Sequence, residues 1–138
     1  MDGIEVRKLK REELLRLIKE APESETRFIK QLKHPYIYFL KAKEQSGILN
    51  SRPLYFGALM KDRDKHILWT VVNKNVKQQF SLFKISKKTV REWADKYGEI
   101  YTTMYKGNDK NIRWTERIGF KPIKEEDNLI TFVLEGGK

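Results

Sequence analysis

The spacing of apolar residues predicts a short strand and then three helices in the first third of the chain. Residues 4–7 alternate between apolar and charged side chains, as a strand does. Residues 11–20 carry leucine and isoleucine at near-helical spacing beside charged residues, which predicts an amphipathic helix. Ser24 is placed to cap a second helix, and a third helix is predicted from Tyr36 to about Gln45, with Gly47 as its stop.

In the middle of the chain the pattern changes to that of a β-hairpin. Residues 54–60 are rich in strand-forming side chains, residues 61–65 form a polar turn, and residues 66–73 make a second strand. The second strand has apolar residues on both faces. This pattern is typical of a central strand that is covered by helices on each side.

Helices and strands alternate in the last third. From Ser86, apolar residues fall at i, i+3, i+4 and i+7 of a helix that Gly98 ends. Residues 99–105 have the pattern of a strand, residues 110–118 that of a short helix, and residues 129–134 that of a final strand.

The order of these elements predicts one α/β (α+β) domain over residues 1–138. A strand, helix, strand unit that begins at His66 implies a parallel pair with a right-handed crossover. The central sheet is therefore expected to be mixed, with helices on both faces. A chain of 138 residues is long enough to bury one core and too short for a second domain.

Composition removes several classes of function. No stretch approaches the roughly 20 apolar residues that cross a bilayer, and residues 1–5 do not begin a signal peptide, so we expect a cytoplasmic protein without a membrane partner. The chain has no cysteine, which excludes disulfides and zinc-thiolate sites. His34 and His66 are far apart in the sequence, so we expect no metal site.

The net charge of +10 favours acidic partners, because a positive surface attracts phosphates at long range. The charge is equally consistent with a solvated, lysine-rich surface. Basic and aromatic residues interleave from Arg27 to Lys43 and from Lys74 to Lys88, a pattern that suits nucleic acid. No recognised nucleic-acid motif accompanies it, and the same aromatics suit a core.

The run from Asn108 to Phe120 carries the most specific pattern. It places a turn asparagine before a short helix and Gly119-Phe120 after it, with Ile112 inside the helix. This segment resembles the closing helix of GNAT-type N-acetyltransferases, whose run is roughly Asn-x-x-Ala-Ile-x-x-Tyr-x-x-x-Gly-Phe. The order of elements before it matches the same family, so the resemblance implies a GNAT-like fold.

The resemblance also implies a cofactor, acetyl-CoA, and an amine as acceptor. In the family this helix borders the pantetheine arm, which assigns cofactor binding to Asn108 and Ile112. The backbone of Val71, Val72 and Asn73 corresponds to the strand that aligns pantetheine. The amine is then expected to attack the thioester directly.

Two departures from the family pattern bear on activity, and the first concerns the general acid. The tyrosine that protonates the departing thiolate in the family falls at Thr115, whose aliphatic hydroxyl is a poor acid near neutral pH. Tyr101, Thr103 and Tyr105 alternate on one face of the preceding strand, and one of these hydroxyls could replace it. We name Tyr105 and Thr115 as the candidate catalytic residues.

The second departure is a loop without glycine. The family carries a glycine-rich loop whose backbone N–H groups hold the pyrophosphate, whereas residues 73–88 contain no glycine. Ser86, Lys87 and Lys88 begin the next predicted helix and could hold phosphates at its N-terminus. The alternative is that Ser86 is an ordinary cap and the lysines are a solvated face.

A narrower resemblance covers roughly residues 40–134. The run Asn-x-x-Asn-Ile-Arg-Trp from Asn108, with Leu40-Lys41-Ala42-Lys43 upstream, is similar to small GNAT-like internal virion or assembly proteins of short-tailed bacteriophages. That resemblance places the chain in a host-cell cytoplasm or a virion. Two functions stay open: an acetyl-CoA-dependent N-acetyltransferase with a degenerate pyrophosphate loop, or an inactive protein that binds a phage or host protein through its basic surface.

Overall fold

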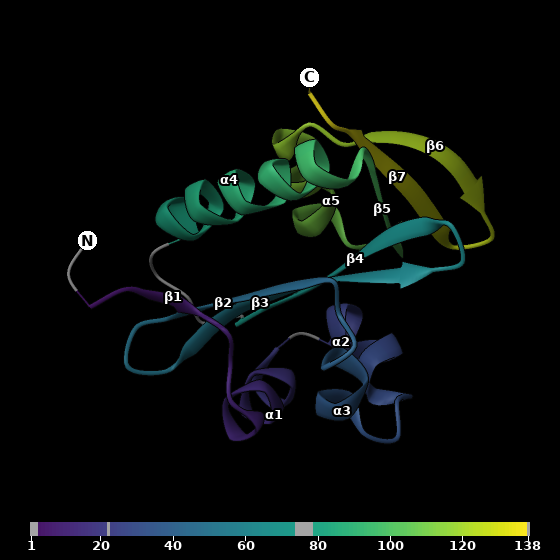
Figure 1. Cartoon of the computed structure of the whole chain (residues 1–138). Coiled ribbons are helices and arrows are strands. Elements are labelled where there is room, and N and C mark those ends of the chain that lie inside the picture. The colour runs from purple at the N-terminus through teal and green to yellow at the C-terminus, as the bar shows by residue number, and fades with distance from the viewer. Residues whose placement is uncertain (1–2, 22, 74–78, 138) are drawn as a thin grey trace. The chain divides into compact units, whose positions relative to one another are not determined.

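A computed structural model describes residues 3–21, 23–73 and 79–137 of the chain (Figure 1). The described chain forms two compact units, Met1–Met60 with Trp69–Leu82 and Lys61–Leu68 with Phe83–Lys138. Both arms of the hairpin run from one unit into the other. Whether the two units act as one domain stays a prediction.

The strands belong to one seven-stranded sheet in the order β1-β2-β3-β4-β5-β7-β6. The β4–β5 pair is parallel, whereas the β1–β2, β2–β3, β5–β7 and β6–β7 pairs are antiparallel. A mixed α/β sheet was expected, and it is confirmed. The elements in chain order are β1 (Glu5–Arg7), α1 (Arg11–Glu20), α2 (Glu23–Lys30), α3 (Pro35–Phe39), β2 (Glu44–Leu49), β3 (Pro53–Asp62), β4 (Lys65–Val72), α4 (Gln79–Tyr97), β5 (Glu99–Tyr105), α5 (Asp109–Ile118), β6 (Lys121–Glu126) and β7 (Leu129–Glu135).

The amphipathic helix predicted over residues 11–20 is α1, which buries Leu14, Leu17 and Ile18. These side chains join a core to which α1, α2, α3 and the strands β2, β3 and β4 contribute. The predicted second helix is α2. It begins at Glu23, so Ser24 lies in its first turn and not at its cap.

An ion pair fixes the start of α1. The guanidinium of Arg7 donates to both carboxylate oxygens of Glu13 at 2.9 Å, and Glu13 also accepts from the backbone N–H of Lys10 at 2.8 Å. The hydrogen bond from Arg7 lowers the pKa of Glu13 to about 2. The carboxylate therefore caps the helix throughout the neutral range.

The third helix is shorter than predicted. α3 ends at Phe39, and residues 44–49, which the prediction divided between the end of a helix and its stop, form strand β2. Gly47 pairs with Phe56 across the sheet, where a Cβ atom would collide with the side chain of Leu9. Gly47 is therefore needed for close packing inside a sheet, and the prediction that it stops a helix is wrong.

The predicted hairpin is present with a tighter turn. Its strands, β3 and β4, are joined by Arg63 and Asp64 alone, so the prediction of a five-residue loop is wrong. Arg63 has a φ of 60°, a left-handed conformation that tight hairpin turns require.

The second unit holds the first part of β4, α4 from Phe83 onward, β5, α5, β6 and β7. Val90, Trp93 and Ala94 of α4 are buried, as the helical spacing predicts, and Gly98 follows the helix with a φ of 96°. Arg91 of α4 donates to the last carbonyl of α5, that of Ile118, at 2.6 Å. Strand β6 was not predicted at all. None of the helices in the described residues is long and apolar enough to span a bilayer.

Candidate functional site

The end of β4, in the first unit, carries the residues expected to align pantetheine. Val71 is fully buried in the core, and Val72 is half-buried. The backbone N–H of Asn73 donates to the carbonyl of Leu54 at 2.9 Å, and its amide donates to Glu20 at 3.5 Å. Asn73 therefore ties the end of β4 to the start of β3 and the end of α1.

Within the second unit, the parallel ladder between β4 and β5 is short. In the described residues it consists of His66 opposite Ile100 and Ile67 opposite Tyr101. One residue further, the side-chain hydroxyl of Thr102 donates to the carbonyl of Leu68 at 3.1 Å. A side-chain hydrogen bond thus takes the place of a backbone hydrogen bond at this position. On its other edge β5 pairs with β7 along its whole length.

Helix α5 has the caps that its sequence predicts. The carbonyl of the Asn108 side chain accepts from the backbone N–H of Asn111 at 3.4 Å, and Gly119 follows the helix with a φ of 121°. Phe120 is buried as the expected anchor. The side-chain nitrogen Nδ2 of Asn108 is buried and has no hydrogen-bond partner among the described residues. A buried donor without a partner is costly, and a ligand carbonyl would satisfy it.

Thr115 lies on the buried face of α5. Its side chain is 6% exposed, and its hydroxyl donates to the sulfur Sδ of Met104 at 3.7 Å. This hydroxyl is committed to a thioether inside the unit. The geometry thus adds to the chemical argument against Thr115 as an acid.

The three hydroxyls that alternate along β5 differ in their surroundings. Tyr101 donates to Glu99 at 3.0 Å, and this bond, followed by partial burial and the charges of nearby carboxylates, raises the pKa of Tyr101. The hydroxyl of Thr103 is hydrogen-bonded to that of Thr131 at 3.1 Å. Tyr105 is half-buried at the end of the strand, opposite Leu129.

The prediction that Ser86 caps a helix is wrong. α4 begins at Gln79, seven residues earlier, and Ser86 is a buried interior residue whose hydroxyl donates to the carbonyl of Phe83 at 3.1 Å. Lys87 is half-buried, with its ammonium 5.9 Å from the centre of the Phe83 ring, and Lys88 is exposed on the same helix. These three residues do not form a helix N-terminus. Residues 74–78 of the predicted glycine-free loop lie outside the described residues.

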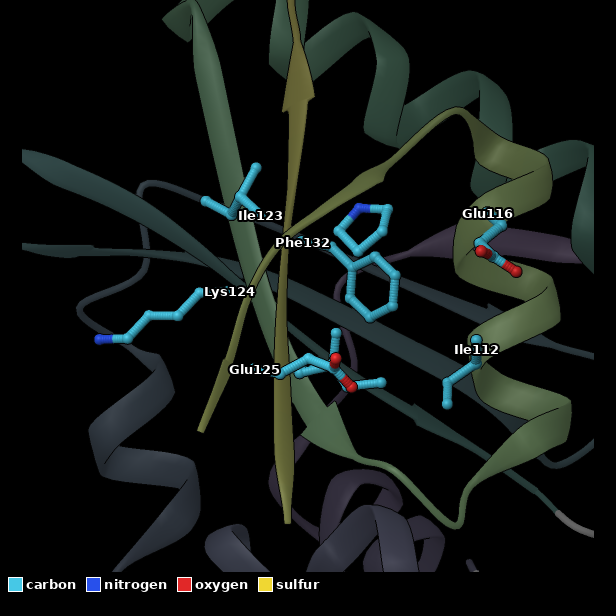
Figure 2. Close-up of a pocket in the computed structure, with 8 residues that line it drawn as sticks. Ile112, Glu116, Ile123, Lys124, Glu125 and Phe132 are labelled. Carbon is cyan, nitrogen blue, oxygen red and sulfur yellow. The ribbon is translucent and has the colours of Figure 1, made fainter. Parts of the chain in front are cut away.

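Ile112 opens into a pocket that sequence reasoning missed. The pocket has a volume of about 470 Å³ and lies among α5, β6 and β7. In Figure 2, Ile112 and Glu116 project from α5 on the side of Phe132, whereas the ammonium of Lys124 extends away from them. The lining residues are Ile112, Glu116, Pro122, Ile123, Lys124, Glu125, Ile130 and Phe132.

The missed pocket follows from the missed strand. Glu125, Glu126 and Asp127 have the composition of a turn, yet the turn contains only Asp127 and Asn128, and β6 precedes it. The signal was this Asp-Asn pair before an apolar strand, because aspartate and asparagine favour turns. Asp127 indeed has a φ of 55°.

No three histidine, aspartate or glutamate side chains in the described part of the chain come together as a metal site would require. His66 instead packs against Tyr97, with 4.7 Å between the ring centres.

Comparison with known proteins identifies the fold. No family model and no curated protein matches the sequence. The structure is similar to that of PH1933 from Pyrococcus horikoshii OT3, with a TM-score of 0.73 and 16% identity over 98% of this chain and 99% of that one. It is also similar to the PaiA N-acetyltransferase of Thermoplasma acidophilum in complex with coenzyme A, with a TM-score of 0.65 and 17% identity over 96% and 98% of the two chains.

A third similar structure is a GNAT-family acetyltransferase of Bacillus anthracis, with a TM-score of 0.67 and 11% identity over 97% of this chain and 95% of that one. Identities this low show a shared fold and nothing finer. The fold predicted from the sequence, a GNAT-like mixed sheet, is confirmed.

Proposed function

We propose that this protein is an N-acyltransferase that uses acetyl-CoA. The observation that carries the proposal is the extent of the likeness: nearly the whole chain superposes on structures named as acetyltransferases, one of them bound to coenzyme A. Fold alone does not establish chemistry, so the residues must supply the rest of the argument.

Asn108 and Ile112 are our candidates for contact with the pantetheine arm. The buried Nδ2 of Asn108 needs an acceptor, and the amides of pantetheine offer carbonyl oxygens. Ile112 is half-buried on the same first turn of α5 and would offer an apolar contact. We keep the backbone of Val71, Val72 and Asn73 as a further candidate, although the Asn73 N–H already donates to Leu54.

We now assign the pyrophosphate to the first turn of α4. The sequence had suggested Ser86, Lys87 and Lys88 for this role. Helix α4 has 19 residues and begins at Gln79, and the positive end of its dipole at this start favours phosphates. The lysines then serve as distant charges. This position agrees with a phosphate loop that precedes the helix, as in the family the sequence resembles.

Bound acetyl-CoA supplies an activated thioester, and the chain must then position the amine and protonate the leaving thiolate. We assign the proton to Tyr105, because a phenol is far more acidic than an aliphatic hydroxyl. Thr115 is the alternative, and its hydroxyl donates to the sulfur of Met104.

A second candidate function is a GNAT-fold protein without catalysis, which would bind a phage or host protein through its basic surface. The hydroxyl of Thr115 favours this second function, because it is buried and hydrogen-bonded to the sulfur of Met104, at the place where the family has its acid. Origin in a bacteriophage stays a prediction that no structural feature addresses.

Thermal unfolding with and without acetyl-CoA tests the proposal. A ligand at 100 times its Kd stabilises by about 2.7 kcal/mol, which raises Tm by several degrees. We expect this shift with acetyl-CoA and transfer of acetyl groups to small primary amines. A shift without transfer would favour the second function. No shift at millimolar acetyl-CoA, or an equal shift with heparin, would contradict cofactor binding.

A further inference from the structure

Two large apolar side chains of the first unit are exposed to solvent. Ile37 is 54% exposed and Leu40 is 57% exposed, one on α3 and the other directly after it. Lys33, Lys41 and Lys43 flank them and are exposed as well. We call these five residues the α3 patch (α3 is labelled in Figure 1).

The α3 patch lies above a cluster of packed aromatic side chains. Between its two apolar residues, Phe39 is buried, with its ring centre 5.1 Å from that of Phe56 and 5.4 Å from that of Trp69. Tyr38 packs on the same Trp69 ring at 5.6 Å. Because this aromatic cluster holds α3 from beneath, Ile37 and Leu40 are kept on the outer side of the helix.

Along the chain from residue 26 to residue 43, every charged side chain is basic. Residues 26–43 contain Arg27, Lys30, Lys33, Lys41 and Lys43 but no aspartate or glutamate. An apolar centre with a basic rim is complementary to a partner that is anionic at its surface and apolar beneath it.

We infer that the α3 patch binds an anionic lipid surface, with Ile37 and Leu40 between the headgroups and the lysines on the phosphates. Lysine is attracted to anionic leaflets and can keep its ammonium at headgroup level. This inference goes beyond the proposed acyl transfer. It also departs from the expectation of no membrane partner, which rested on spanning segments and not on peripheral contact.

Other partners fit less well. Nucleic acid would need exposed rings for stacking, but Phe39 is buried and Tyr36 and Tyr38 are half-buried. Lysine is depleted at the core of protein interfaces. A second copy of this chain would bring like charges together, which is unfavourable.

Co-flotation with vesicles tests the inference. We expect the whole chain to bind phosphatidylcholine vesicles that contain about one third phosphatidylglycerol, and not pure phosphatidylcholine. Ile37→Ser with Leu40→Ser should weaken binding by about tenfold or more, and Lys33→Gln or Lys41→Gln by about fivefold each. Ile123→Ser is the matched control, because Ile123 is also 54% exposed but lies on β6.

A fluorescent label reports the contact directly. The chain has no cysteine, so Leu40→Cys and Ile123→Cys each give one labelling site. An environment-sensitive dye at position 40 should shift to the blue with anionic vesicles, and the dye at position 123 should not. Unchanged Tm values would show that the variants fold. Equal vesicle binding by the double serine variant, or the same shift at position 40 with poly-glutamate or an oligonucleotide, would overturn the inference.

Discussion

The starts of α4 and α5 look alike in the sequence and differ in the structure. Each was expected at a polar capping residue, Ser86 for one helix and Asn108 for the other. Asn108 caps α5 through its side-chain carbonyl, whereas Ser86 lies inside α4 and bonds back to Phe83. A short polar side chain can accept from a backbone N–H at the start of a helix, and a serine inside a helix can donate to the carbonyl three or four residues earlier.

The residues before each candidate cap decide the difference. Gly107 precedes Asn108, and glycine does not favour a helix. Leu82, Phe83 and Ile85 precede Ser86, and these residues can continue the helix backwards into the core. A capping residue therefore marks a helix start only where the chain before it cannot be helical.

Gly119→Ala should destabilise the end of α5 most strongly. A residue with a Cβ at its positive φ costs about 1–3 kcal/mol, and the added Cβ would also lie 2.6 Å from Nη1 of Arg91. Gly98→Ala, after α4, is the matched control: Gly98 has a φ of 96°, but no atom would lie within 4 Å of the added Cβ. Urea unfolding should show the larger loss at position 119. Equal losses would mean that the backbone conformation alone matters.

Asn108→Ala should cost about 1 kcal/mol of unfolding free energy, because it removes the cap of α5. It should also weaken the binding of acetyl-CoA by roughly tenfold if Nδ2 donates to a carbonyl of the ligand. Urea unfolding and calorimetric titration measure the two effects. Asn108→Asp keeps the cap but loses the donor, so it should retain stability and still lose affinity. Full affinity in the aspartate variant would remove Asn108 from the cofactor site.

Glu13→Gln should cost less than about 1 kcal/mol, because the ion pair with Arg7 is partly exposed. The folded pKa of about 2 lies below the ordinary 4.5, so the ionised form is favoured by folding. This contribution is complete above pH 4.5 and is lost as the pH falls toward 2. Unfolding measured across this range should show a steeper acid loss in the wild type than in Glu13→Gln. Parallel curves would show that this carboxylate is not linked to folding.

Ser86→Ala should change stability by less than about 0.5 kcal/mol, because alanine suits a helix interior and the lost bond was internal to the helix. Acetyl-CoA affinity should not change. The cap expected from the sequence would instead cost about 1 kcal/mol. Comparison of this variant with Asn108→Ala in the same urea series therefore distinguishes a cap from an interior serine. A loss as large as that of Asn108→Ala would favour the start of α4 at Ser86.

The sequence predicted some residues of the candidate site and missed others, because only some of them belong to a local pattern. The α5 residues Asn108 and Ile112 were found because their pattern is local. The pocket beside them was missed because β6 is exposed throughout and carries mostly charged residues, so no apolar alternation marks it. Its pairing with β7 includes a register shift between Pro122 and Lys124, which local patterns do not predict.

Local patterns in the sequence were enough to predict the helices α1 and α5, the hairpin strands and the GNAT-like order of elements, because side-chain spacing and caps act within a few residues. Three features became visible only in the folded chain: residues 44–49 form a strand, α4 begins before Ser86, and Thr115 faces Met104. Each of these depends on a partner distant in the sequence: Phe56 opposite Gly47, the core around the buried Ser86, and the sulfur of Met104. Backbone pairing and burial across such distances outweigh local preference, and neither is visible in a short stretch of residues.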